Sequence, residues 1–234
     1  DVARHMEVSK PSVCHAVATL RDGGFLTMDS DYFLHLTDVG REVAEQIYEK
    51  HRFFTDRLIE ALILTMKCET PKVIDNPDDY EARANIMWAG MVAHNNICGV
   101  GRSQDWSSHA IEHELSALYD CAHGAGLAVT MPAVFTYVMN HDVMRFAQIA
   151  VRVWGCEMDF AHPEKTAREG IEALRSFLIS IGMPKNFEQL KAREEDIPKL
   201  AHVCCYGDGQ TAHTVGGFVP LEQKDVEAIY RLML

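Results

Sequence analysis

Three histidines in the middle of the chain have the residue type and spacing of metal ligands. His109 and His113 are four residues apart, so on a helix they share one face, about one turn from each other. His123 follows ten residues later, beside Gly124 and Gly126, where a turn can bring its imidazole back to that face. Neutral imidazole nitrogens bind zinc, iron and other divalent ions. The same spacing also arises by chance on helix surfaces, so both a metal site and three unrelated surface histidines remain open.

Other potential ligands have structural interpretations that we favour. Asp105, four residues before His109, could complete a local cluster, but a helix N-cap is the more common role for such a residue. Cys204 and Cys205 could ligate a metal, but we expect two buried structural cysteines. The seven cysteines are irregularly spaced and include no C-x-x-C pair, which disfavours a disulfide framework or a zinc ribbon.

The composition is that of a globular protein. With 234 residues, 47% of them apolar and 24% charged, the chain can form one large or two modest domains, and the composition disfavours a disordered or rod-like protein. No apolar run reaches the roughly 18 residues of a membrane span. Without a signal-peptide pattern we expect a cytoplasmic protein, and without an initiator Met we expect a fragment at the N-terminus. The net charge of −12 disfavours broad nucleic-acid binding but permits a small DNA-reading surface.

The elements that must position these residues change in character near residue 58. Before it, the pattern predicts a helix over residues 2–8, a second over about 10–20, a hairpin from 25–28 and 32–36, and a long amphipathic helix after Thr37 and Asp38. This order is typical of a winged helix-turn-helix.

The pattern after residue 58 is helical nearly throughout. Helices are predicted over about residues 83–97, 143–154 and 222–233, and another is predicted to begin at Pro163. The segment shows no recurrent strand alternation. It also has no glycine-rich phosphate loop, because Gly207-Asp208-Gly209 lies in a polar loop and matches too little of the dinucleotide motif. We therefore expect a mainly α protein, with a winged helix-turn-helix over 1–58 and an all-α bundle of seven or eight helices over 59–234.

The first segment carries several motifs beyond its order of elements. They are Asp1-Val2-Ala3, Ser9-Lys10-Pro11-Ser12-Val13, Leu20-Arg21-Asp22-Gly23-Gly24-Phe25-Leu26, Leu36-Thr37-Asp38-Val39-Gly40 and Lys50-His51-Arg52. With them the segment resembles the DNA-binding domain of the iron- and manganese-dependent metalloregulatory repressors. The resemblance implies that the second helix enters a major groove, with Ser9, Lys10, Ser12 and His15 as its contacts.

Charge and missing ligands limit that interpretation. Arg4, Lys10 and Arg21 against Glu7 leave a net charge of only +2 on the DNA-facing surface, so useful affinity requires dimerisation. His51 matches a metal ligand of the repressor family, but its partner carboxylates are not found in this chain. We therefore expect a structural or surface role for His51.

The longer segment carries its own set of motifs. They are residues 76–89, residues 105–115, His123-Gly124-Ala125-Gly126-Leu127-Ala128 and Gly216-Gly217-Phe218-Val219-Pro220-Leu221. With them residues 59–234 resemble the C-terminal helical domain of the iron-containing, or group III, alcohol dehydrogenases, especially the butanol-dehydrogenase-like branch. The resemblance implies that His109 and His123 hold a catalytic divalent metal, iron or zinc. It also implies that His113 faces the substrate and the nicotinamide, as the catalytic residue that exchanges a proton with the alcohol.

Two parts of that family's machinery are not found in the sequence. The family has a D-x-x-x-H pair of metal ligands on an earlier helix and an N-terminal NAD(P)-binding domain. Asp1 and His5 have the spacing of the pair, but their neighbours match the repressors, so we interpret them as a decoy. We expect a truncated dehydrogenase module that is inactive alone and forms a homodimer. Its partners would be a small alcohol or aldehyde if a complete enzyme forms, and DNA through the winged helix.

Two alternatives remain open at this point. In one, the chain is a metal-dependent, DNA-binding transcriptional repressor that uses its helical domain for dimerisation or metal sensing. In the other, the chain is a recombined coding fragment with neither activity.

Overall fold

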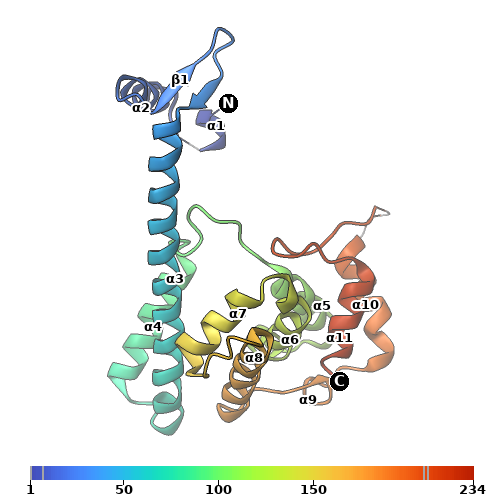
Figure 1. Cartoon of the computed structure of the whole chain (residues 1–234). Helices are drawn as coiled ribbons and strands as arrows, with labels where there is room; N and C mark the ends of the chain where they lie inside the picture. Colours follow the sequence, from blue (N-terminus) through green and yellow to red (C-terminus); the bar gives the residue numbers. More distant parts are fainter. Residues whose placement is uncertain (1, 7, 208, 210) are drawn as a thin grey trace. The chain divides into compact units, whose positions relative to one another are not determined.

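The computed structural model describes residues 2–6, 8–207, 209 and 211–234 (Figure 1). The chain divides into two compact units, Asp1–Leu58 and Ile59–Leu234. Three residues named above lie outside the described residues: Asp1 of the decoy pair, Glu7 of the charge count for the first segment, and Asp208 of the polar loop.

The first unit contains two helices and a hairpin. Its elements are α1 (Val2–His5), α2 (Lys10–Asp22), β1 (Leu26–Met28), β2 (Leu34–Leu36) and the start of α3 (Asp38–Asp75). The strands pair antiparallel with Thr27 opposite His35. Helix α2 begins where expected, because the Ser9 hydroxyl accepts a hydrogen bond from the Ser12 amide at 3.3 Å. The elements follow the expected order, while their assignment to a DNA-binding winged helix stays a prediction.

The second unit is predominantly helical, which confirms the prediction for this segment. After α3 its helices are α4 (Tyr80–His94), α5 (Ser107–Tyr119), α6 (His123–Val138), α7 (Val143–Ile149), α8 (Pro163–Ser180), α9 (Phe187–Leu190), α10 (Ile197–Tyr206) and α11 (Gln223–Arg231). Short 3-10 turns occupy Met139–His141 and Glu194–Asp196.

Helix α1 is shorter than the helix predicted over residues 2–8. Two other predicted helices differ from the structure in ways that local chemistry explains. Helix α4 begins at Tyr80, earlier than predicted, because the Asp79 side chain caps it by accepting from the Ala82 amide at 3.0 Å. The helix predicted over 143–154 is α7 followed by a π-helical segment, Ala150–Trp154. Gly170 of α8 packs against this segment, where an added Cβ would collide with Ala150.

The main core lies where α5, α6, α10 and α11 meet (Figure 1). Ile111 and Leu115 of α5 are fully buried there. Tyr230 of α11 is also fully buried, and its hydroxyl donates to the Ile111 carbonyl at 2.6 Å. A buried hydroxyl keeps its stabilising effect only when its hydrogen bond is made. This bond therefore fixes α11 against the middle of α5.

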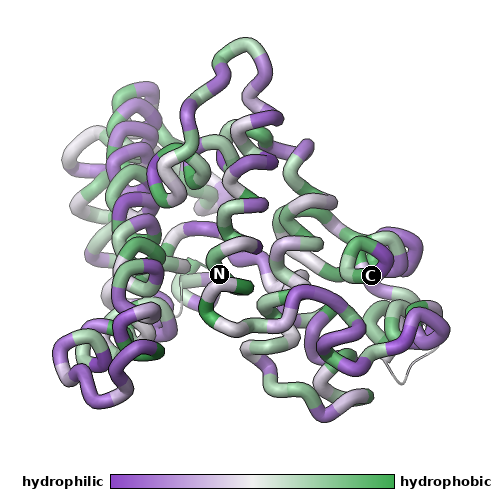
Figure 2. The backbone as a smooth tube through the Cα atoms, turned by 90° about the horizontal axis from the view of Figure 1, so that it is seen from below, coloured by the Kyte–Doolittle hydropathy of each residue, from purple (hydrophilic) through white to green (hydrophobic). Residues whose placement is uncertain are grey.

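No helix among the described residues is long and apolar enough to cross a membrane. Figure 2 shows hydrophilic and hydrophobic residues interspersed along the chain.

The cysteines give a direct test of this packing. Cys204 and Cys205 are buried, as expected, whereas Cys14 and Cys68 are exposed. Burial raises the pKa of the Cys204 thiol to about 12. At pH 8 only about one Cys204 in ten thousand is then the reactive thiolate.

We therefore predict that iodoacetamide alkylates Cys14 and Cys68 at least about tenfold faster than Cys204 and Cys205 in the native chain. Peptide mass spectrometry over a time course measures the four rates. In guanidinium the difference should vanish. Equal rates in the native chain would contradict the packing of α10.

Candidate metal centre

Helix α5 determines where two of the three histidines lie. Ile111 and Leu115 anchor one face of the helix in the core. His109 and His113 lie on another face, with ring centroids 6.3 Å apart. His113 is exposed and His109 is half-buried. The apolar face thus fixes the direction in which both imidazoles point.

The third histidine reaches the same place through a tight turn. Helix α5 ends at Tyr119, and its C-cap residue, Asp120, adopts a left-handed conformation with φ of 51°. The Ser116 hydroxyl oxygen lies 3.2 Å from the Cys121 carbonyl oxygen, so the returning chain passes close to α5. His123 then opens α6, and its ring centroid lies 5.3 Å from that of His109 and 5.2 Å from that of His113. The structure therefore brings together the three histidines that the spacing singled out.

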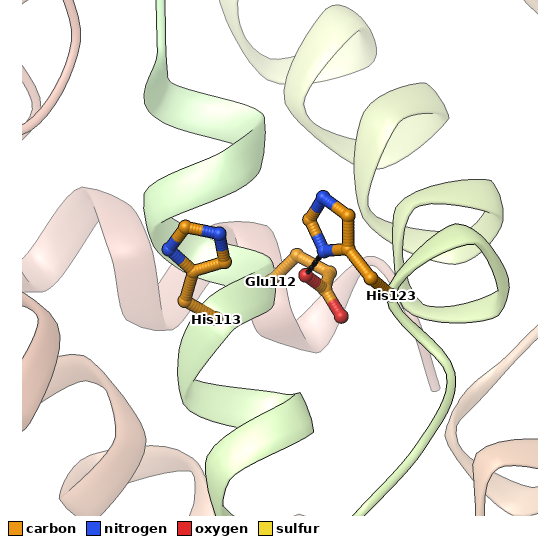
Figure 3. Close-up of side chains that lie close together, drawn as sticks. All are labelled: Glu112, His113 and His123. Carbon is orange, nitrogen blue, oxygen red and sulfur yellow. Dashed lines mark hydrogen bonds and ion pairs between the residues drawn. The ribbon is translucent and has the colours of Figure 1, made fainter.

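Sequence reasoning missed a fourth member of this cluster. Glu112 is 0% exposed, and its carboxylate contacts Nδ1 of His123 and the Ser116 hydroxyl (Figure 3). Ligand atoms of Glu112, His113 and His123 all lie within 4.8 Å of one another. The available signal was a charged residue directly after Ile111, on the face of α5 that the apolar pattern assigns to the core.

The electrostatics of the cluster favour an uncharged imidazole at His109. The pKa of His109 is lowered, chiefly because burial disfavours the charged ring and also because His123 and His113 would repel it. A metal-binding histidine must be neutral, so this environment leaves the ring of His109 in the form that binds an ion.

Asp105 has neither of the roles considered for it. The N-cap of α5 is Trp106, which makes no side-chain cap hydrogen bond. Asp105 instead accepts from the Gly217 amide at 2.8 Å and from the Ser107 hydroxyl at 2.5 Å. It therefore ties the start of α5 to the loop that closes between Val215 and Leu221.

The residue types present suit a divalent transition metal. Three imidazoles and one carboxylate are the ligands that zinc and iron accept in proteins. The buried pair Cys204 and Cys205 belongs to the core and is outside this cluster. Of the described residues, Glu112, His113 and His123 form the group whose geometry could hold an ion, with the His109 ring directly beside them.

The residues predicted to contact DNA lie in the first unit. Ser9, Lys10, Ser12 and His15 are exposed, at the N-cap and along the first part of α2. The hydroxyls of Ser9 and Ser12 lie 2.8 Å apart and hydrogen-bond to each other. His51 lies within α3. The metal ligand roles of His109 and His123 and the DNA contacts of α2 stay predictions.

Comparison with known proteins identifies the larger part of the chain. The C-terminal region of the Fe-containing alcohol dehydrogenase family matches residues 46–234. The chain belongs to this family. The match to the iron-containing alcohol dehydrogenases begins before the second compact unit, within α3.

Individual dehydrogenases and reductases agree with this assignment. NADH-dependent butanol dehydrogenase B of Clostridium acetobutylicum is 34% identical over 184 residues, which are 78% of this chain and 46% of the relative. The NADPH-dependent aldehyde reductase YqhD of Escherichia coli is 32% identical over 145 residues, 62% of this chain and 37% of the relative. The crystal structure of NADH-dependent butanol dehydrogenase A from Thermotoga maritima matches with a TM-score of 0.70 and 36% identity, over 77% of this chain and 46% of that one. The chain thus spans about half the length of the curated butanol dehydrogenases that it matches.

Two glycines of α6 provide a matched test of the site's packing. A Cβ added to Gly126 would collide with the Glu112 carboxylate, while a Cβ at Gly124 meets nothing within 4 Å. We predict that Gly126→Ala lowers the free energy of unfolding by about 1–3 kcal/mol, because the buried carboxylate has no room to move.

Gly124→Ala is the control and should be neutral or stabilising by up to about 1 kcal/mol, since alanine favours helix. Urea unfolding followed by circular dichroism measures both. Equal stability of the two variants would show that α6 does not pack on Glu112 in this way.

Proposed function

We propose that this chain contributes the metal-binding half of an NAD(P)-dependent alcohol dehydrogenase that interconverts small alcohols and aldehydes. The observation that carries the proposal is the convergence of His109, His113 and His123, with ring centroids 5.2 to 6.3 Å apart, in a chain of the iron-containing alcohol dehydrogenase family. The names of the relatives, which include butanol dehydrogenases and an aldehyde reductase, favour a small primary alcohol or its aldehyde as substrate.

Each histidine has a separate role in this proposal. His109 and His123 hold the divalent ion, iron or zinc, through neutral ring nitrogens. His113 is the more exposed neighbour of that pair on α5, and it exchanges a proton with the substrate hydroxyl. A bound ion supplies Lewis-acid polarisation of the substrate oxygen, and a nicotinamide supplies or accepts the hydride. Loop 215–221, held to the start of α5 by Asp105, keeps the chain at that end of the helix in place.

We propose further that the chain alone turns over little or no substrate. It spans about half the length of its relatives, and its sequence has no glycine-rich dinucleotide motif after a strand. Two histidines form only part of a zinc or iron coordination sphere, which commonly has at least three protein ligands at catalytic sites. Metal binding by this chain should therefore be measurable but weak.

Metal titration tests the site. We predict that the wild-type chain binds Zn²⁺ or Fe²⁺, and that His109→Ala or His123→Ala weakens binding by more than about 100-fold, beyond the 10–100-fold typical of losing an outer contact. Isothermal titration calorimetry, with anaerobic handling for iron, gives the affinities.

His162→Ala is the matched control, because His162 is exposed at the start of α8 and outside the cluster. Its affinity should equal that of the wild type. Equal metal content in all four proteins would refute the assignment of His109 and His123. Turnover of butanol with NAD⁺ by the chain alone would refute its proposed inactivity and support the dehydrogenase chemistry.

As a second function, we propose that the first unit binds DNA, either beside the dehydrogenase-like part or as a repressor that uses the helical unit to dimerise. The supporting observation is that Ser9, Lys10, Ser12 and His15 are all exposed along the start of α2, in a helix, helix, hairpin, helix order. The match to the dehydrogenase family begins at residue 46, after all four proposed DNA contacts, so DNA binding needs a separate experiment.

A gel-shift experiment separates this function from the first. A palindromic site should bind with a steep loss of affinity as salt rises, and Lys10→Ala should weaken binding on all sequences by removing a phosphate contact. Lys224→Ala, an exposed lysine of α11, is the control. A flat binding curve at low salt would dismiss DNA binding.

A further inference from the structure

We propose that Glu112 is the positioning residue of His123: its buried carboxylate holds the Nδ1–H group and thereby presents Nε2 as the nitrogen that binds the metal. The inference deepens the proposed function and rests on it, since it concerns the same metal centre. It adds a residue that the spacing of the histidines does not reveal.

The contacts of Glu112 account for both of its carboxylate oxygens. Oε1 accepts from the Ser116 hydroxyl, and Oε2 contacts Nδ1 of His123. Figure 3 shows the carboxylate directed at this ring nitrogen, while the second nitrogen of His123 points away from it. Glu112 therefore holds His123 through Nδ1 and makes no contact with Nε2.

The surroundings of the carboxylate favour positioning over direct metal binding. Glu112 is 0% exposed, whereas 47% of the His123 side chain is exposed. Gly126 of α6 lies so close to Oε1 that a Cβ there would collide with it. An ion that approaches from solvent meets the imidazole of His123 before it meets the carboxylate.

Burial also explains why the carboxylate needs this histidine. An ionised carboxylate without partners is strongly disfavoured inside a protein. Among the described residues no lysine or arginine pairs with Glu112, so Ser116 and His123 are its compensating contacts. The Glu112–His123 contact therefore both compensates the buried carboxylate and orients the His123 ring.

The chemical consequence is a choice of tautomer. An ionised carboxylate only accepts hydrogen bonds, so Nδ1 of a neutral His123 must carry the proton. The lone pair then resides on Nε2, the nitrogen directed away from Glu112. A carboxylate behind a metal-binding histidine fixes its ring and raises its basicity, and loss of such a contact costs about 10–100-fold in metal affinity.

Two measurements on the full chain test the proposal. Long-range ¹H–¹⁵N NMR of the histidine rings reads the tautomer of His123 without metal and identifies the nitrogen that binds when Zn²⁺ is added. Calorimetry measures the Zn²⁺ affinity. The variants are Glu112→Gln, which removes the charge but keeps a similar shape, and Ser116→Ala, which removes the second contact of the carboxylate.

We expect the wild-type chain to show the Nδ1–H tautomer and to bind Zn²⁺ through Nε2. Glu112→Gln should lower the affinity by about 10–100-fold. Ser116→Ala should lower it by less, and it keeps the test decisive if Glu112→Gln does not fold. Glu114→Gln, the same change two residues along α5, is the control and should leave the tautomer and the affinity as in the wild type.

Three results would overturn the inference: an Nε2–H tautomer in the metal-free wild type, Zn²⁺ bound through Nδ1, or unchanged affinity in a folded Glu112→Gln variant. Failure of the proposed function gives a different result. If the wild type binds no Zn²⁺ but His123 keeps its Nδ1–H tautomer, the metal centre is wrong and the Glu112–His123 pair is supported.

Discussion

The arrangement of the candidate metal centre depends on the burial of one face of α5. Ile111 and Leu115 are fully buried, and the Tyr230 hydroxyl donates a hydrogen bond to the Ile111 carbonyl. A helix held in this way cannot rotate about its axis without exposing apolar surface and breaking a buried hydrogen bond. The direction of the His109 and His113 side chains is therefore set by core residues that bind no metal or substrate in the proposed mechanism.

Glu112 lies at the junction between this core and the site. It belongs to the buried face of α5, yet its partner, His123, belongs to α6 and is partly exposed. Small residues make the arrangement sterically possible, because only glycine at position 126 leaves room for the carboxylate. Asp105 has a comparable role at the other end of the site, where it ties α5 to loop 215–221. Carboxylates thus hold the backbone and a ring in place beside the histidines proposed to do the chemistry.

The two units of the chain support separate conclusions. Family membership rests on residues 46–234 and on the likeness of that region to butanol dehydrogenases. The first unit contributes a pair of helices, a two-stranded hairpin and the start of α3. Four exposed residues near the start of α2 are its proposed DNA contacts. Their test is independent of the metal centre.

Local patterns in the sequence determined much of this protein. The 3.6-residue period predicted several of the helices, including the start of α2 near Lys10, and the four-residue spacing placed His109 and His113 on one face. These features depend on neighbours within one or two turns, so they can be read from the chain. The cap at Asp79 is equally local, so the start of α4 is also encoded in the sequence near it.

Only the tertiary structure decided which distant groups meet. The return of His123 depends on a left-handed residue at Asp120 and on the packing of α6 against α5. The contacts of Asp105 with Gly217 and of Tyr230 with Ile111 each join residues more than a hundred positions apart. Glu112 is the clearest example of a position whose environment the sequence alone does not reveal. A charged residue in a helix is exposed by default, and it becomes part of the core only because another helix supplies its hydrogen-bonding partner.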